Sequence, residues 1–370
     1  LAVFVLMYTR ARAPTPLAHP LIHALLAGAA GAYATADLFN LYVWFEVMFI
    51  AALGLIVAGR RLHRLDAGLK YLVLNMFGTV VLLVAVSGLY GVTGQLNLDA
   101  IGEALATRSD PLALILIALV LVALLIKAGA FPFLFWLPAA YPSLPVPLLA
   151  LFTAITTKVA AYALLRITGH FMPGGMPEYS TALGWLAVAT MIAGVLGAVY
   201  HYDVRRILAF HSVSQMGYIL LATALGGGAG RAAALFFMIH HALVKANLYL
   251  IAGMIGRSGS YDLRRVGGLC RTQPWLAVLF GVTAAALVGF PPLSGFWPKL
   301  LILREGFSQA AYVWTAAALT TSGLTLLSMA KIWTEAFWKP HPAGEELGKA
   351  VHAPGMVRLG GACVGCSVHR

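Results

Sequence analysis

Apolar runs of about 20 residues fill most of this sequence, and they constrain the fold more than any other feature. A helix needs about 20 apolar residues to cross the hydrocarbon core of a bilayer, and inside lipid it satisfies its own backbone hydrogen bonds. The chain is 61% hydrophobic and only 10% charged, whereas soluble domains carry about 25% charged residues. The sequence therefore predicts an all-α polytopic membrane protein. The predicted spans are 17–36, 37–59, 67–92, 111–133, 146–169, 181–200, 206–226, 231–256, 274–303 and 311–337.

The two ends of the chain depart from this pattern. Residues 1–16 begin with LAVFVLMYTR, which resembles the end of a truncated transmembrane helix and lacks the basic start and small-residue cleavage site of a signal peptide. Residues 339–370 are polar and glycine-rich, unlike a membrane helix, and we expect a gene fragment or a shifted reading frame there. The membrane domain is predicted to occupy 17–338, between this truncated start and the atypical tail.

Positive charges lie in alternate loops between the runs. Loops rich in Lys and Arg stay on the cytoplasmic side of a membrane, so this alternation predicts that the loop after residue 59 is cytoplasmic. It also explains the net charge of +12 without nucleic acid, because the charges do not gather on one polar face. The rich set is Arg10 and Arg12; Arg60, Arg61, Arg64 and Lys70; Arg205 and Arg206; and Arg257, Arg264, Arg265 and Arg271. The poor set carries little more than Arg108, Arg231 and Arg304.

Several ionisable residues lie inside the apolar runs. A charged side chain near the bilayer centre costs about 2.5–3.5 kcal/mol on insertion scales, so such residues usually have a function. Lys127 lies about 16 residues into its run, too deep for easy snorkelling, whereas Lys331 is close to a helix end and can reach water. The set comprises Glu46, Lys127, Lys158, His240, His241, Lys245, Lys299 and Lys331, with His211 and Glu335 nearer the helix ends.

This set has the composition of a proton relay. Glu46 is the single deep carboxylate beside five lysines, and burial and repulsion between like charges both favour the neutral amine, which accepts a proton. A lone buried histidine is usually a structural residue, but His241 and Lys245 are four residues apart and share a helix face. The predicted relay consists of Glu46, Lys127, Lys158, His241, Lys245 and Lys299.

Prolines interrupt two of the runs, and these interruptions resemble each other. FPFLFWLP at 131–138 follows Lys127, and FPPLSGFWP at 290–298 precedes Lys299. The two broken helices are five spans apart and must therefore run in opposite directions. Inverted repeats with broken helices are typical of transporters.

The spacing of the lysines supports a duplication. Lys158 follows Lys127 after 31 residues, and Lys331 follows Lys299 after 32. The sequence therefore predicts repeats roughly at 17–169 and 181–338.

No pattern in the sequence predicts a cofactor or a metal site. Cys270, Cys363 and Cys366 have neither a disulfide framework nor iron–sulfur spacing, and a lone CxxC in a tail is weak support for a metal. The glycines of 88–94 end a span and do not follow a strand, which argues against a nucleotide loop.

Five dense stretches resemble a known family: ADLFNLYVWFEVMFIA, KAGAFPFLFWLPAAYPSLPVPLLALFTAITTKVAAYALLR, HSVSQMGYILLA, HHALVKANLYLIAGMI and VGFPPLSGFWPKL. They look like the antiporter-like subunits shared by Mrp-type Na+/H+ antiporters, respiratory complex I and membrane-bound hydrogenases. The stretch around Glu46 and HHALVKANLYLIAG most resemble the D subunit of the Mrp antiporter. The resemblance covers residues 17 to about 338.

The resemblance implies a fold of fourteen helices with two inverted five-helix repeats, of which this chain would hold about ten to eleven. It implies that Glu46 pairs with Lys127 on a broken helix, and that Lys299 lies on the second broken helix. Lys158, His241 and Lys245 match relay positions between them. The implied function is proton translocation in a multisubunit Na+/proton antiporter, in the plasma membrane of a prokaryote. The implied partners are the other subunits, protons, a monovalent cation such as Na+, and lipid.

Two other functions remain open on the sequence. The chain could be a proton-pumping subunit of an NADH:quinone oxidoreductase or a membrane-bound hydrogenase, in which case the redox chemistry would lie in other subunits. It could also be a passive helix bundle. The residues favour a transporter subunit over an enzyme.

Overall fold

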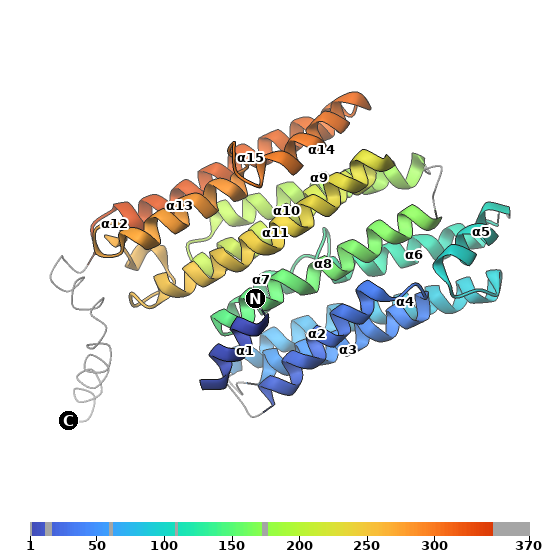
Figure 1. Cartoon of the computed structure of the whole chain (residues 1–370), viewed down its shortest axis with the longest axis horizontal. Helices are drawn as coiled ribbons and strands as arrows, with labels where there is room; N and C mark the ends of the chain where they lie inside the picture. Colours follow the sequence, from blue (N-terminus) through green and yellow to red (C-terminus); the bar gives the residue numbers. More distant parts are fainter. Residues whose placement is uncertain (1, 12–16, 59–61, 108–109, 172–176, 343–370) are drawn as a thin grey trace.

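The computed structural model describes residues 2–11, 17–58, 62–107, 110–171 and 177–342 (Figure 1). These residues form helices, turns and two isolated β-bridges, which confirms the all-α prediction. The predicted tail lies mostly outside the described residues, as does the loop before residue 17. In chain order the elements are α1 (Ala2–Ala11), α2 (Ala18–Ala34), α3 (Leu38–Val57), α4 (Leu62–Thr93), α5 (Leu98–Thr107), α6 (Pro111–Ala128), α7 (Trp136–Ala140), η1 (Tyr141–Ser143), α8 (Val146–Phe171), α9 (Pro177–Tyr200), α10 (Val204–Leu225), α11 (Gly227–Gly256), η2 (Leu263–Arg265), α12 (Leu269–Thr272), α13 (Pro274–Val288), α14 (Phe296–Ser308), α15 (Tyr312–Ile332) and the π-helical turn η3 (Trp333–Trp338).

Each predicted span corresponds to a helix or a broken helix in the bundle of Figure 1. Within the described residues, eight helices are long and apolar enough to cross a membrane: α3, α4, α6, α8, α9, α10, α11 and α15 with η3. The helix α2 is shorter, at 17 residues, and the ninth predicted span is divided between α13 and α14. The sequence did not predict α5, a short helix within a loop.

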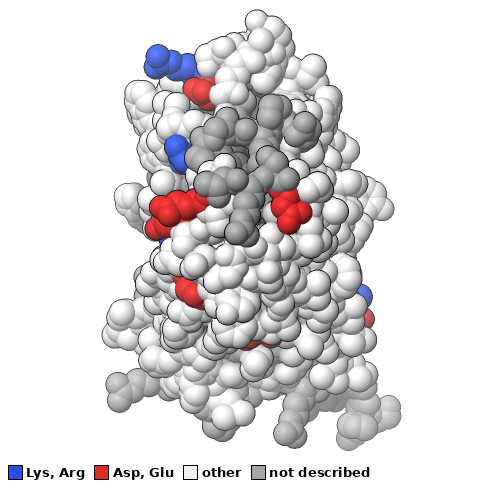
Figure 2. All heavy atoms as spheres, turned by 90° about the vertical axis from the view of Figure 1, so that its right-hand side faces the viewer, with Lys and Arg blue, Asp and Glu red and all other residues white. Residues whose placement is uncertain are grey.

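The two ends of the bundle differ in charge, as the loop pattern predicts. We use the term basic end for the end of the bundle that carries the α3–α4, α9–α10 and α11–α12 connections. Arg64, Lys70, Arg205, Arg206 and Arg264 lie there. Figure 2 shows the opposite end, where patches of Asp and Glu lie at several places on the face and Lys and Arg lie mainly near its edges.

Two matching β-bridges relate the two halves of the chain. Asp37 caps α3 and pairs with Asn97 after α4, and Asp203 caps α10 and pairs with Asp262 after α11. The second bridge lies at the basic end and the first at the opposite end, so the halves run in opposite directions through the bundle (Figure 1). This arrangement is the inverted repeat that the sequence predicts.

The broken helices follow one backbone design. α6 ends at Gly129 with φ 69°, and α13 ends at Gly289 with φ 98°; both values lie in the left-handed region that glycine adopts without a steric penalty. The next helix begins seven residues after each glycine, at Trp136 and at Phe296. The two breaks superpose when Gly129 is matched with Gly289. The sequence similarity instead matches the Phe-Pro pairs at 131 and 290, which gives a register that differs by one residue.

The lysine spacing does not mark equivalent positions. Lys331 Nζ donates to the carbonyl of His201 at 2.6 Å, just beyond the end of α9. In the first half the same place is taken by Arg166, whose Nη1 donates to the carbonyl of Thr35, just beyond α2, at 2.6 Å. Lys331 therefore corresponds to Arg166, and not to Lys158. Both cations stabilise the C-terminal end of a neighbouring helix.

Candidate functional site

Three helices bring Glu46, Thr79 and Lys127 together in the first half. Lys127 lies in the last turn of α6, directly before the break, and its Nζ is 4.0 Å from Oε1 of Glu46 on α3. The hydroxyl of Thr79 on α4 accepts from Lys127 Nζ at 2.9 Å and donates to Glu46 Oε1 at 2.6 Å. Gly78 allows α4 to approach α6, because a Cβ there would lie 3.0 Å from Ile126 Cγ2. The predicted pair is thus joined through a hydroxyl.

The Lys127 side chain is buried among aromatic residues but has polar neighbours. Its Nζ lies 5.2 Å from the centre of the Phe45 ring, a favourable position for a cation. A cavity of about 20 Å³ beside it is lined in part by Tyr71, Asn75 and Thr156. A cavity of this size has room for one water molecule when polar groups line it.

Lys158 lies on α8 and has no carboxylate partner among the described residues. Its Nζ donates to the carbonyl of Thr153 at 2.7 Å and to the hydroxyl of Thr157 at 3.2 Å. Thr156, adjacent to Thr157 on α8, lies within hydrogen-bonding distance of the hydroxyl of Tyr141, at 3.4 Å. Thr156, which lines the cavity beside Lys127, is thus only two residues before Lys158 on α8.

His241 and Lys245 share one buried face of α11, as their spacing predicts. Lys245 Nζ donates to the carbonyl of Leu208 on α10 at 2.8 Å. Neither ring nitrogen of His241 has a hydrogen-bond partner in the described part of the chain, and the same holds for both amide atoms of Gln215 and the hydroxyl of Tyr249. Buried polar groups are normally hydrogen-bonded to protein or ordered water. This region has the polar surface that a hydrated passage requires.

Lys299 lies in the first turn after the second break. Its Nζ donates to the carbonyls of Leu287 and Val288, at 3.1 and 2.8 Å, which the interruption of α13 leaves free. It also donates to Ser322 Oγ at 3.2 Å, and Ser322 is 2.7 Å from the hydroxyl of Tyr218. A broken helix thus supplies backbone acceptors at membrane depth.

The two remaining histidines contact serine hydroxyls. His240, which faces away from Lys245, approaches the second break, with Nδ1 3.0 Å from Ser294 Oγ. His211 Nε2 is 2.9 Å from Ser328 Oγ on α15. Either ring nitrogen can carry the proton in these contacts.

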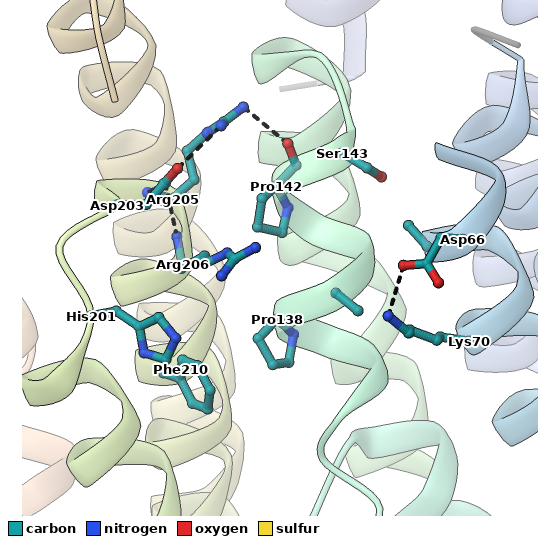
Figure 3. Close-up of a pocket in the computed structure, with 12 residues that line it drawn as sticks. Asp66, Lys70, Pro138, Pro142, Ser143, His201, Asp203, Arg205, Arg206 and Phe210 are labelled. Atoms are coloured by element: carbon teal, nitrogen blue, oxygen red, sulfur yellow. Dashed lines mark hydrogen bonds and ion pairs between the residues drawn. The ribbon is translucent and has the colours of Figure 1, made fainter. Parts of the chain in front are cut away.

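A wider opening, which we call the vestibule, lies at the basic end (Figure 3). Its volume is about 460 Å³. Lys70 pairs with Asp66 at 2.7 Å on one side, and Arg205 donates to the carbonyl of Pro142 at 2.9 Å on the other. The residues that line it are Asp66, Ala67, Lys70, Pro138, Ala139, Pro142, Ser143, His201, Asp203, Arg205, Arg206 and Phe210.

The structure brings Glu46 and Lys127 together, and among the described residues no other two members of the predicted relay make a direct hydrogen bond or ion pair. The sequence reasoning missed the hydroxyls of Thr79, Ser322 and Tyr218, which contact these lysines or their partners. A search for Ser, Thr and Tyr within the apolar runs would have found them, among many others.

Residues 35–325 match the family described as NADH:quinone oxidoreductase/Mrp antiporter, TM. The chain is 41% identical over 331 residues to the D subunit of the Na(+)/H(+) antiporter of Alkalihalophilus pseudofirmus, a match that covers 89% of this chain and 67% of the relative. It is 36% identical over 317 residues to the Bacillus subtilis protein of that name, a match that covers 85% of this chain and 64% of the relative. It is also 36% identical over 322 residues to the N subunit of the NADH-quinone oxidoreductase of Desulforudis audaxviator, covering 85% and 64%. The chain thus spans about two thirds of the length of these relatives.

Solved structures share the fold. A chain of the Mrp complex from Dietzia sp. DQ12-45-1b matches with a TM-score of 0.83 and 38% identity, over 91% of this chain and 64% of that chain. A chain of the membrane-bound sulfane sulfur reductase, an archaeal respiratory membrane complex, matches with a TM-score of 0.83 and 30% identity, over 94% and 72%. The protein is a multi-pass membrane protein that belongs to the NADH:quinone oxidoreductase/Mrp antiporter family.

Proposed function

We propose that this chain is the proton-translocating membrane subunit of a multisubunit antiporter that exchanges Na+ or another monovalent cation for protons. The observation that carries the proposal is the Glu46–Thr79–Lys127 group, which contains a buried lysine and lies beside a helix break. It occurs in a chain that is 41% identical to the D subunit of a Na(+)/H(+) antiporter. The membrane domain is 17–338, with repeats roughly at 17–169 and 181–338.

The proton route uses the six predicted residues in order. A proton reaches Lys127 through a half-channel in the first repeat, crosses the middle of the bundle, and leaves by Lys299. Hydroxyls and buried polar atoms lie along this route, next to the lysines themselves. The intermediate carriers are Lys158, His241 and Lys245.

The Glu46 and Lys127 pair controls the first step. A carboxylate close to an amine favours the ammonium form, and its departure favours release of the proton. Glu46 retains 23% of its side-chain exposure, whereas Lys127 retains 5%. The carboxylate is therefore the less buried member of the pair.

Proton pumping within a redox complex is the second candidate. The similarity to the N subunit of an NADH-quinone oxidoreductase, at 36% identity, equals that to the Bacillus subtilis antiporter protein. In such a complex this chain would carry protons, and other subunits would supply the redox chemistry.

The test uses everted membrane vesicles that contain this chain assembled with the other subunits of its complex. Dissipation of a proton gradient on addition of Na+ is compared between wild type, Glu46→Ala, Lys127→Ala and the control Arg304→Ala at an exposed residue. We expect Na+ to dissipate the gradient in wild type and control but not in the other two variants, with assembly unchanged on native gels. Proton uptake driven by NADH or hydrogen, with no response to Na+, would contradict the antiporter assignment.

A further inference from the structure

We propose that Thr79 is a positioning residue that couples the charge of Lys127 to the position of Glu46, by reversing the direction of its hydroxyl hydrogen. The inference rests on the proposed function and concerns a residue outside the predicted relay. Its basis is the geometry of the Glu46–Thr79–Lys127 group.

The ammonium and the carboxylate communicate through the hydroxyl. Their nearest atoms are 4.0 Å apart, which exceeds the range of an N–H···O hydrogen bond, about 2.7–3.2 Å. Both contacts of Thr79 are short enough for hydrogen bonds, at 2.9 Å to Lys127 Nζ and 2.6 Å to Glu46 Oε1. A hydrogen bond in which one partner is charged is also stronger than a neutral one.

When Lys127 is charged, its hydrogen-bond donors and those of Thr79 can pair with the acceptors of Thr79 and Glu46 in only one way. An ammonium only donates, an ionised carboxylate only accepts, and a hydroxyl donates once. Thr79 must then accept from Lys127 and donate to Glu46. A neutral amine has a lone pair, so after Lys127 loses its proton the hydroxyl hydrogen can turn toward Nζ. Glu46 then loses its donor and its counter-charge in the same event.

Thr79 differs in how it uses its hydroxyl from the buried threonines that bond to their own helix. In a helix a threonine commonly donates to the carbonyl one turn earlier. Thr156, Thr190 and Thr223 do so, at 2.9, 2.6 and 2.9 Å. The hydroxyl of Thr79 instead spans the gap between two other helices.

Glu46 has no second anchor among the described residues that would hold it in place. There its carboxylate makes one hydrogen bond, to Thr79, and one ion pair, to Lys127. Within the described part of the chain, Tyr71 is the one other titratable group that lines the cavity beside Lys127. Loss of the Thr79 bond therefore releases the carboxylate, and a returning proton on Lys127 recruits it again.

The experiment compares Thr79→Val with Thr79→Ser in the complete complex. Valine matches the shape of threonine without a hydroxyl, and serine keeps the hydroxyl. We expect the valine variant to transport about tenfold more slowly, as expected for loss of one hydrogen bond to a charged group, and its dependence of rate on pH to shift. The serine variant should remain within about twofold of wild type. Thr223→Val is the control, because that hydroxyl bonds to its own helix.

A second readout separates this inference from the proposed function. The infrared carboxylate band of Glu46, assigned with Glu46→Gln, should shift in Thr79→Val and remain in place in Thr79→Ser, whichever ion or redox reaction drives transport. Thr79→Ala replaces the valine variant if the latter fails to assemble. An unchanged band together with wild-type rate and pH profile in the hydroxyl-free variant would overturn the role of Thr79. Absence of a Na+ response in wild type, with the band shift present, would overturn the antiporter assignment alone.

Discussion

Replacement of Lys245 by methionine should make the protein more stable and inactive at the same time. Lys245 is fully buried, and the carbonyl of Leu208 is the single hydrogen-bond partner that the described residues give its ammonium. An ammonium carries three donors, so two lack a partner in the described part of the chain. Methionine has a similar length and needs no hydrogen bond.

The magnitude follows from these contacts. Each buried donor without a partner costs about 1–3 kcal/mol, and the one bond that is lost contributes about 1.5–3 kcal/mol. The carbonyl of Leu208 keeps a partner, because Ser212 Oγ also donates to it at 3.1 Å. The balance is a gain of about 1–3 kcal/mol in the free energy of unfolding.

The assay measures thermal unfolding of the purified complex in detergent and Na+-dependent proton movement in vesicles. Lys331→Met is the matched control with the opposite expectation. Lys331 donates to carbonyls at the end of α9 and is only partly buried, so its loss should cost about 1 kcal/mol and leave transport intact. If Lys245→Met lowers the unfolding temperature and retains transport, the lysine is structural and the relay argument fails at that position.

Three further changes test the architecture. Gly129→Ala should lower the free energy of unfolding by at least about 1 kcal/mol, because φ is 69° and a Cβ would lie 1.9 Å from Leu137 Cδ1. Gly91→Ala is the control, because a Cβ at Gly91 meets open space. Equal unfolding temperatures for the two variants would refute the role assigned to Gly129. Asp203→Ala should lower the free energy of unfolding by about 1 kcal/mol, since it removes the acceptor of the Arg205 and Arg206 amides; Asp203→Asn should recover most of the loss, and a failure to recover would assign the effect to charge. Arg166→Lys should have an unfolding temperature close to that of wild type, and Arg166→Ala a lower one, because Lys331 already binds the end of a helix in this way in the second half. Equal unfolding temperatures for the two variants would contradict the equivalence of Arg166 and Lys331.

Much of the fold follows from the sequence because membrane spans depend on length and polarity alone. The apolar runs, the basic loops and the two proline interruptions each have one physical interpretation in lipid. The Glu46 and Lys127 pair was expected from the family resemblance, because residue types alone left five lysines as possible partners of the single deep carboxylate. The order and direction of the helices follow from the same runs.

The parts that could not be predicted depend on contacts between helices. Thr79 is one of many hydroxyl residues in apolar runs, and its role becomes visible only when α3, α4 and α6 are packed. The match between Arg166 and Lys331 could not be seen in the sequence because the two residue types differ. It becomes visible in the structure because both side chains donate to the end of an equivalent helix, α2 or α9. The one-residue shift between the two breaks arises because backbone turns, and not residue identities, determine the structural match.

The two halves share a backbone design but differ at the position that holds the carboxylate. Nine residues after the capping Asp37 stands Glu46, and nine residues after the capping Asp203 stands Ser212, whose hydroxyl is 3.4 Å from Thr153 Oγ1. At this matched position, therefore, the first half places an acid opposite its broken helix and the second half does not. The lysine of the second half lies beyond its break and is held by fixed carbonyls. Along the route proposed above, the first lysine therefore has an acidic partner and the last lysine has none, so control by a carboxylate belongs to the first half alone.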